Sequence, residues 1–258
     1  MKFENKMIIT DLDATFGSPV TGPAKGNVDA VKYFTENGGI FTVASGRVPS
    51  YMSMWEDVKH IANAPMILCN GAFCYDFANG NLTDELELNK DKAIEIVRTV
   101  LSDYPEISMR CCIEAVETHL AGDEILEDFK HWTRVSFDGE KGGLDRLRAY
   151  LEPIYSNDFA FMKACDVIFE FQAPGATKGQ GIDRLKARLN AEGRITDSVT
   201  VYAVGDFEND LDMLSNADIA CCPDNAIDSV KALSQIHLCH YTEGAIADLI
   251  DRIESGKG

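Results

Sequence analysis

Four aspartates stand where two apolar segments of the sequence end. Asp11 and Asp13 follow the first apolar run, and Asp206 and Asp210 follow a second one near the other end of the chain. Open parallel sheets bind ligands at the carboxyl ends of their strands. If both strands belong to one sheet, several carboxylates meet at one place and repel one another unless a cation lies among them. The pattern therefore predicts a Mg²⁺ site with one carboxylate left over for chemistry.

The first pair has the groups that phosphoryl transfer needs. One carboxylate of Asp11 and Asp13 could attack phosphorus and form an aspartyl phosphate. The other could protonate the leaving alkoxide and then take a proton from water, while Mg²⁺ neutralises charge on the phosphoryl group. On its own, Asp-Leu-Asp could equally be a capping residue and a solvated acid. Asp206 at a strand end favours the metal reading, and Asp210 could either support the metal or complement a helix N-terminus.

Two further segments offer groups that bind phosphate. Ser45 and Gly46 follow another predicted strand and present a hydroxyl beside accessible backbone N–H groups. Arg47 could reach a phosphate or form a structural ion pair. Lys178 lies in the capping box Thr-Lys-Gly-Gln, which places it at a helix N-terminus that favours anions. The alternative for Lys178 is a solvated surface lysine.

The order of the predicted elements indicates an interrupted α/β core. Strands are predicted at 7–10, 40–44, 66–69, 199–204 and 219–222, and helices around 28–34, 49–61, 182–189, 211–214 and 246–253. Alternation of this kind predicts right-handed βαβ units and a parallel sheet. A hairpin is predicted around Asn79-Gly80.

The middle of the sequence has a different character. One helix with apolar residues at 94, 97 and 101 is followed by strand-like runs at 107–113, 159–163 and 167–172, with helical material expected between these runs. We therefore predict a core formed by residues 1–81 and 177–258, interrupted by an inserted α+β cap at 82–176.

Composition limits the class of partner. The chain has 258 residues and a formal net charge of -18, which disfavours nucleic acid and anionic membranes. We expect no secretory or membrane-spanning segment, and the eight cysteines include no CxxC pair. We expect buried thiols and a cytoplasmic protein. The HxxH of His237 and His240 is not expected to bind metal, and the sequence does not indicate an oligomeric state.

Four blocks in this order resemble the motifs of the haloacid dehalogenase (HAD) superfamily of phosphatases. They are DLDAT at 11–15, ASGR at 44–47, Lys178, and GDFEND at 205–210. The large insertion resembles the type IIB (C2B) cap of the Cof-like subfamily, as do CNGA at 69–72 and DNA at 224–226. The resemblance covers nearly the whole chain. It implies a Rossmann-like parallel-sheet core, an inserted α+β cap and Mg²⁺-dependent hydrolysis.

The resemblance also implies a role for each matching residue. Asp11 would be the nucleophile and a Mg²⁺ ligand, and Asp13 the general acid and base, with its backbone carbonyl on the metal. The remaining positions would bind metal (Asp206 and Asp210) or the phosphoryl group (Ser45, Gly46, Lys178 and Asn209). Ala14 departs from the usual glycine, and Phe16-Gly17 replaces the more usual leucines.

We therefore expect a phosphatase that acts on a small phosphorylated metabolite, such as a sugar phosphate, beneath a cap that closes over the site. One alternative is a phosphomutase on the same scaffold. Another is a phospho-aspartate signalling module resembling receiver domains, which the chain length, the second acid and the large insertion fit poorly. Specificity is expected from the cap, where the candidate anion contacts, or else surface residues, are Arg110, Lys130, His131 and Lys163.

Overall fold

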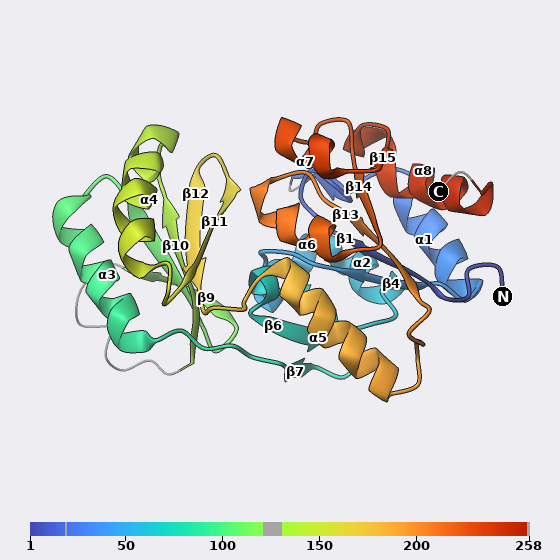
Figure 1. Ribbon diagram of the computed structural model, residues 1–258, viewed down its shortest axis with the longest axis horizontal. Helices are drawn as coiled ribbons and strands as arrows, with labels where there is room; N and C mark the ends of the chain where they lie inside the picture. The colour runs from blue at the N-terminus through green and yellow to red at the C-terminus, as the bar shows by residue number, and fades with distance from the viewer. Residues whose placement is uncertain (19, 121–130, 257–258) are drawn as a thin grey trace.

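The computed structural model describes residues 1–18, 20–120 and 131–256. The chain forms two lobes, a core built from both ends of the sequence and a cap built from its middle (Figure 1). Among the described residues, no helix is both long and apolar enough to cross a membrane. The cysteines are all free thiols.

A parallel sheet of five strands lies at the centre of the core. Its order is β15 (Ile236–His237), β14 (Ile219–Cys222), β13 (Thr200–Val204), β1 (Lys6–Thr10) and β4 (Ile40–Val43). In this register Thr10 of β1 lies opposite both Val204 and Val43. The segments that follow these three strands therefore leave the sheet side by side at one edge, as the sequence predicted.

Helices cover both faces of this sheet, because alternate side chains of each strand point to opposite layers. On one face lie α1 (Asn27–Glu36), α2 (Glu56–Ile61) and α8 (Ala245–Glu254), and on the other α5 (Lys178–Ala191), α6 (Leu211–Asn216) and α7 (Asp228–Leu233). Ile8 of β1 packs in the first layer, while Met7 and Ile9 pack in the second. The predicted α/β core is confirmed.

A small antiparallel sheet extends the core towards the cap. It consists of β5 (Met66–Leu68), β6 (Phe73–Asp76) and β7 (Asn81–Thr83), and Gly80 (φ 73°) forms the predicted hairpin turn. A two-stranded ribbon, β2 (Gly17–Ser18) and β3 (Gly22–Pro23), follows the first aspartate pair.

The single helix predicted over 49–61 is wrong in its first half. Two 3₁₀ turns, Pro49–Tyr51 and Ser53–Trp55, precede the short helix α2. Met52 and Trp55 are both fully buried. Residues three apart point the same way in a 3₁₀ turn, so this geometry places both side chains in the core.

The cap is an antiparallel sheet with two helices on the side away from the core (Figure 1). The strand order is β11 (Ala160–Cys165), β12 (Ile168–Gln172), β10 (Trp132–Asp138), β8 (Ser108–Ile113) and β9 (Val116–Leu120), and the helices are α3 (Lys90–Asp103) and α4 (Lys141–Tyr155). β9 and β10 lie where only helical material was predicted. From Arg134 to Asp138, β10 alternates polar and apolar side chains, which is the pattern of a strand with two different faces.

The two faces of the cap sheet have different chemistry. Val135 and Phe137 of β10 pack with Phe169 and Phe171 of β12 in an apolar cluster beneath α3 and α4. The intervening residues on the opposite face are polar and buried, among them Arg134, Ser136, Glu170 and Gln172. The polar face lies towards the core and carries the cap's contribution to the site described below.

The chain passes from the core into the cap and back again once each. Leu86 and Ala173 pack with the core cluster, whereas Leu88 and Phe171 belong to the cap cluster. Since β7 pairs with β6 of the core, we propose that the cap begins near residue 87 and ends near residue 172.

Candidate active site

The carboxylate of Asp11 lies directly beyond β1. The Asp11 backbone N–H donates to the Val204 carbonyl at 2.8 Å, which continues the β1–β13 ladder by one residue. Only 7% of Asp11 is exposed. Lys178 Nζ contacts both Asp11 Oδ1 and Asp210 Oδ1 at 2.6 Å. Lys178 is 1% exposed, so the reading of this residue as a surface lysine is wrong.

Local backbone structure places Lys178 at the site. The Thr177 hydroxyl accepts from the Gln180 N–H at 3.3 Å and caps α5, which makes Lys178 the first helical residue. Gly179 lies so close to α6 that a Cβ at this position would come within 2.6 Å of the Asp212 carbonyl oxygen. The close packing of α5 and α6 therefore brings Lys178 to the edge of the sheet.

Three carboxylates form a group that could hold a metal ion. One oxygen each from Asp11, Asp206 and Asp210 lies within 4.8 Å of the others. Asp210 Oδ2 accepts from the backbone N–H groups of Asp206 and Phe207, at 2.9 and 3.1 Å. Thr15 Oγ1 donates to Asp206 Oδ1 at 2.8 Å. These bonds hold the carboxylates of Asp206 and Asp210 in place before any cation binds.

The charge in this group is not balanced by the protein alone. Burial raises the pKa of Asp11 to about 7, although Lys178 opposes the shift. Burial and the charge of Asp11 raise the pKa of Asp206 to about 8. Three carboxylates face one ammonium group, and their hard oxygen atoms are the ligands that divalent cations such as Mg²⁺ prefer. The donor set fits a divalent metal.

The Asp13 carboxylate is not one of these three and pairs with Arg47 instead. Arg47 donates two hydrogen bonds to the Asp13 carboxylate, from Nε at 2.7 Å and from Nη2 at 2.8 Å. The Arg47 Nη1 group also donates to the Tyr51 carbonyl at 2.9 Å. Arg47 therefore forms an ion pair in the structure and, through it, sets the position of Asp13.

Ala14 adopts the left-handed conformation in the loop between the two sides of the site. Its φ is 61°, and its N–H donates to the Gly17 carbonyl at 2.8 Å. This conformation costs a residue with a Cβ about 1–2 kcal/mol. The structure thus gives a physical reason why glycine is the more usual residue here.

The phosphate-binding candidates meet at the same place. Ser45 is 1% exposed, and its hydroxyl accepts from the Arg47 N–H at 3.2 Å. Asn209 lines the same cavity and donates to Asn70 Oδ1 at 3.0 Å. Gly46 packs against the Asn70 side chain, where a Cβ would come within 3.2 Å of the carboxamide.

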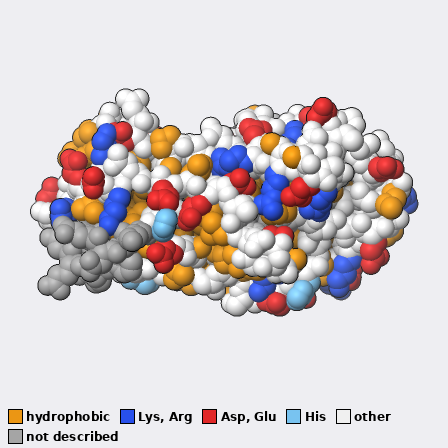
Figure 2. Space-filling view, turned by 90° about the horizontal axis from the view of Figure 1, so that it is seen from below, with side chains coloured by type: hydrophobic (Ala, Val, Ile, Leu, Met, Phe, Trp, Pro, Cys, Tyr) orange, Lys and Arg blue, Asp and Glu red, His pale blue; other side chains and the backbone are white. Residues whose placement is uncertain are grey.

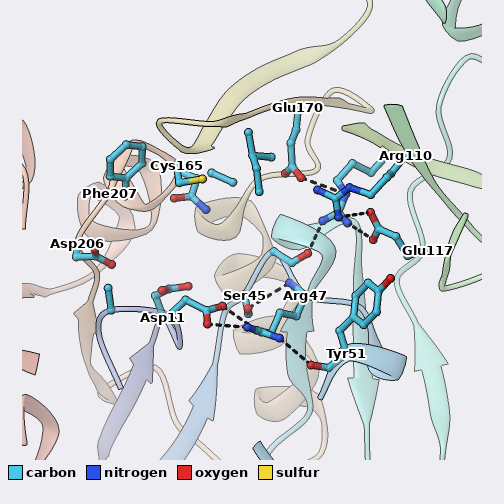
Figure 3. A pocket seen from close by; sticks show the side chains of 17 residues that line it. Asp11, Ser45, Arg47, Tyr51, Arg110, Glu117, Cys165, Glu170, Asp206 and Phe207 are labelled. Atoms are coloured by element: carbon cyan, nitrogen blue, oxygen red, sulfur yellow. Dashed lines mark hydrogen bonds and ion pairs between the residues drawn. The ribbon is translucent and has the colours of Figure 1, made fainter. Parts of the chain in front are cut away.

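These groups open into a cavity of about 490 Å³ between core and cap (Figure 3). Six of the eight candidate site residues line it directly, and the other two, Lys178 and Asp210, are buried beneath it. The lining residues from the core are Asp11, Asp13, Ala14, Ser45, Gly46, Arg47, Tyr51, Asp206, Phe207 and Asn209, and those from the cap are Arg110, Glu117, Arg134, Ala164, Cys165, Ile168 and Glu170.

Buried charges of the cap form the far wall of the cavity, and the sequence did not reveal them. Arg134 is 3% exposed and contacts Glu117 Oε2 at 2.6 Å and Glu170 Oε1 at 3.4 Å. It also donates to the Gly46 carbonyl of the core. The alternation of polar and apolar residues in β10 could have indicated a strand with one polar face, but not that this face is buried.

The candidate anion contacts of the cap have different surroundings. Arg110 lines the cavity, and its partners are Asp138, at 2.6 and 2.7 Å, and Glu117, at 2.9 Å. Lys163 is buried and pairs with Asp145. His131 is half-exposed and bonds Glu87 at 2.6 Å, away from the cavity. Lys130 lies outside the described residues.

The outer surface carries both signs of charge. On the face shown in Figure 2, Lys and Arg side chains lie beside Asp and Glu side chains. The net charge of -18 is therefore not expressed as a uniformly acidic surface on this side.

Comparison with known proteins agrees with this geometry. The sequence model of a family described as haloacid dehalogenase-like hydrolase matches residues 8–117 and 112–250. The chain belongs to this family. The predicted HAD superfamily and the predicted enzyme class, a hydrolase, are confirmed.

Curated and solved relatives cover nearly the whole chain. An uncharacterized hydrolase of Schizosaccharomyces pombe is 25% identical over 96% of this chain and 90% of its own length. A HAD/Cof-like hydrolase structure from Plasmodium vivax has a TM-score of 0.82 at 20% identity and covers 97% and 96% of the two chains. A HAD subclass IIB sugar phosphatase has a TM-score of 0.77 at 18% identity and covers 96% and 98%. The chain therefore has the fold of Cof-like, subclass IIB members, with core and cap together.

Proposed function

We propose that this hydrolase is a Mg²⁺-dependent phosphatase of small phosphorylated metabolites, sugar phosphates or similar molecules, and that Asp11 is its nucleophile. One observation carries the proposal: Asp11, Asp206, Asp210 and Lys178 converge at a cavity that core and cap line together. Mg²⁺ would be held by the three aspartates and the Asp13 carbonyl, and when bound it would neutralise charge on the phosphoryl group.

The residues of the site account for both halves of the reaction. Asp11 attacks phosphorus, and the bond between phosphorus and the ester oxygen breaks. Asp13, positioned by Arg47, enters the step with a proton taken up on one carboxyl oxygen, gives that proton to the leaving alkoxide and afterwards takes a proton from water. That water attacks phosphorus, breaks the bond to Asp11 and releases phosphate.

The phosphoryl oxygens have a separate set of partners. Lys178 supplies a buried positive charge, and Ser45, the Gly46 N–H and Asn209 supply hydrogen-bond donors around the same space. Donors that are fixed in place stabilise charge as it develops in the transition state. They also give an anionic substrate a local site within a chain of net negative charge.

The cavity suits a leaving group of limited size and mixed polarity. A space of about 490 Å³ accommodates a small organic phosphate, and its lining combines Ile168 and Phe207 with the charged wall of the cap. Because the two arginines of that wall, Arg110 and Arg134, already have carboxylate partners, we propose a leaving group rich in hydroxyl groups rather than a second phosphate.

The decisive experiment is a screen of phosphorylated metabolites with and without Mg²⁺, in which both free phosphate and isomerised products are measured. Wild-type protein is expected to release phosphate only with Mg²⁺, and Asp11→Asn is expected to be inactive and folded. An isomerised sugar phosphate in place of free phosphate would instead establish a phosphomutase. Near-normal activity of Asp11→Asn would refute the role of Asp11.

A further inference from the structure

The core and the cap are joined by a line of hydrogen bonds that ends at the phosphoryl site. Asn209 donates to Asn70 Oδ1 at 3.0 Å, and Asn70 Nδ2 donates to Glu170 Oε2 at 2.6 Å. The other oxygen, Glu170 Oε1, accepts from Ser136 Oγ at 2.7 Å. Asn209 and Asn70 belong to the core, whereas Glu170 and Ser136 belong to the cap sheet.

The chemistry of Glu170 gives this line a direction. An ionised carboxylate can only accept hydrogen bonds, so Asn70 must turn its NH₂ group towards Glu170. The Asn70 Oδ1 atom then faces Asn209, which must donate a hydrogen bond to it from its own NH₂ group. One acid in the cap therefore fixes the orientation of two carboxamides in the core, and the second of them lines the cavity.

Burial makes these bonds strong and their loss expensive. Asn70 is fully buried and Glu170 is 3% exposed, and a buried polar group that lacks its partner keeps the full cost of its desolvation. Asn70 also has φ 50°, a conformation that asparagine tolerates better than most residues. Its backbone N–H donates to the Ser45 carbonyl at 2.9 Å, so Asn70 contacts the phosphate-binding loop as well.

A second contact between the lobes meets the same loop. Arg134 of the cap donates to the Gly46 carbonyl, and its Nε lies 3.4 Å from Glu170 Oε1. Two cap residues therefore contact the loops of the phosphoryl site: Glu170, through Asn70, and Arg134, through the Gly46 carbonyl. Glu170 makes the first contact and lies beside the residue that makes the second. By contrast, the ion pairs of Arg110, on the same wall, are with Asp138 and Glu117, both in the cap.

We propose that Glu170 is a positioning residue: from the cap, through Asn70, it orients Asn209 and the Ser45-Gly46 loop for the phosphoryl group. The inference rests on the proposed function, in which Asn209 and this loop bind phosphate. It means that the cap does more than enclose the substrate, because the core residues that bind phosphate are oriented only when the cap contacts them. Glu170 itself touches no reacting atom.

The test is a double-mutant cycle with inorganic phosphate as the probe. Glu170→Met removes the acceptor at similar size, and Asn70→Gly removes the carboxamide at a position whose positive φ suits glycine. The measured quantity is the inhibition constant of phosphate against hydrolysis of p-nitrophenyl phosphate with Mg²⁺. Each single change is expected to raise that constant about tenfold, because each removes a charge-assisted hydrogen bond.

The double variant carries the decision. If Glu170 acts through Asn70, adding Glu170→Met to Asn70→Gly changes the inhibition constant by no more than about twofold. Independent effects would multiply to about a hundredfold and would overturn the proposal. An unchanged constant in Glu170→Met would overturn it as well. Glu95→Met, on α3 of the cap and outside the cavity lining, is the matched control, and its constant is expected to stay within about twofold of wild type.

Two further experiments test whether Glu170 acts only on folding or only on the leaving group. The loss in kcat/KM for Glu170→Met is expected to be the same for an aryl and an alkyl phosphate, and a loss confined to one of them would contradict the proposal. Should Glu170→Met fail to fold, Glu170→Gln replaces it, since its carboxamide no longer dictates the direction of the bonds. The loss in kcat/KM caused by Glu170→Gln is expected to be smaller and must vanish in the Asn70→Gly background. A loss that persists there refutes the inference.

The wild-type protein separates this inference from the proposed function. A wild-type protein without Mg²⁺-dependent hydrolysis on any phosphate ester would refute the proposed function itself. An active wild-type protein whose phosphate inhibition is indifferent to Glu170 would refute only the positioning role.

Discussion

Replacing Lys178 with methionine tests the electrostatic balance of the site. Lys178 is buried, and its ammonium group lies 2.6 Å from both Asp11 and Asp210. Methionine keeps much of the side-chain volume and removes the charge. The change leaves the three carboxylates without the ammonium group that contacts two of them.

The size of the effect follows from these two contacts. At 2.6 Å and an effective dielectric constant of about 20, each contact contributes a gross attraction of about 6 kcal/mol. The cost of burying the ammonium group offsets much of this attraction, and removal of one partner from a buried ion pair typically costs about 3–5 kcal/mol. We expect Lys178→Met to lower the free energy of unfolding by that amount at pH 8 without Mg²⁺.

The direction of the pH dependence is fixed by the carboxylates. Burial raises the pKa of Asp11 to about 7. A carboxyl with a raised pKa in the folded state stabilises the fold at low pH, and this contribution is lost as the pH rises through the folded pKa. Protonation at pH 5 therefore relieves the repulsion that Lys178 offsets, and the cost of Lys178→Met should shrink there.

Urea unfolding at pH 5 and pH 8, with and without Mg²⁺, measures these quantities. Mg²⁺ should stabilise Lys178→Met more than wild type, because the variant site is more negative. Lys186→Met, on the same helix but outside the site, is the matched control. An equal loss of stability at both pH values, or a variant as stable as wild type at pH 8 without Mg²⁺, would refute the reasoning.

Three other measurements follow from the site geometry. Ala14→Gly should raise the free energy of unfolding by about 0.5–1 kcal/mol, because it relieves a left-handed alanine at the cost of some chain entropy; a decrease in urea unfolding would contradict this. Protons compete with the metal for these carboxylates, because the pKa is about 7 for Asp11 and about 8 for Asp206. The rise in Tm caused by Mg²⁺ should therefore grow from pH 6 to pH 8.5. A falling trend would count against a carboxylate site. Arg47→Met should lower kcat about tenfold with little change in KM, because Asp13 loses the partner that orients it; an unchanged kcat would exclude that role.

Local patterns in the sequence predicted the core side of the site. Asp11, Asp206 and Ser45 each follow an apolar run, and the rule that parallel strands end at one edge was sufficient to bring them together. The capping box correctly placed Lys178 at a helix N-terminus. These inferences depend on neighbours in sequence or on the topology of a single sheet.

The cap side of the site could not be reached in this way. Glu170 and Arg134 belong to different strands, and their pairing depends on the antiparallel register of β10 and β12. Their burial depends in turn on how the cap sheet lies against the core. A charged residue in a strand most often faces solvent, so only the tertiary arrangement distinguishes these two from surface residues.

The central claim is that Asp11 carries the phosphoryl group during hydrolysis. Acid quench during turnover with Mg²⁺ and p-nitrophenyl phosphate, followed by mass spectrometry of the peptides, tests it most directly. We predict a phosphoryl adduct on Asp11 that disappears in Asp11→Asn together with the activity. Rapid Mg²⁺-dependent hydrolysis by Asp11→Asn, or an adduct on a different residue, would contradict the account.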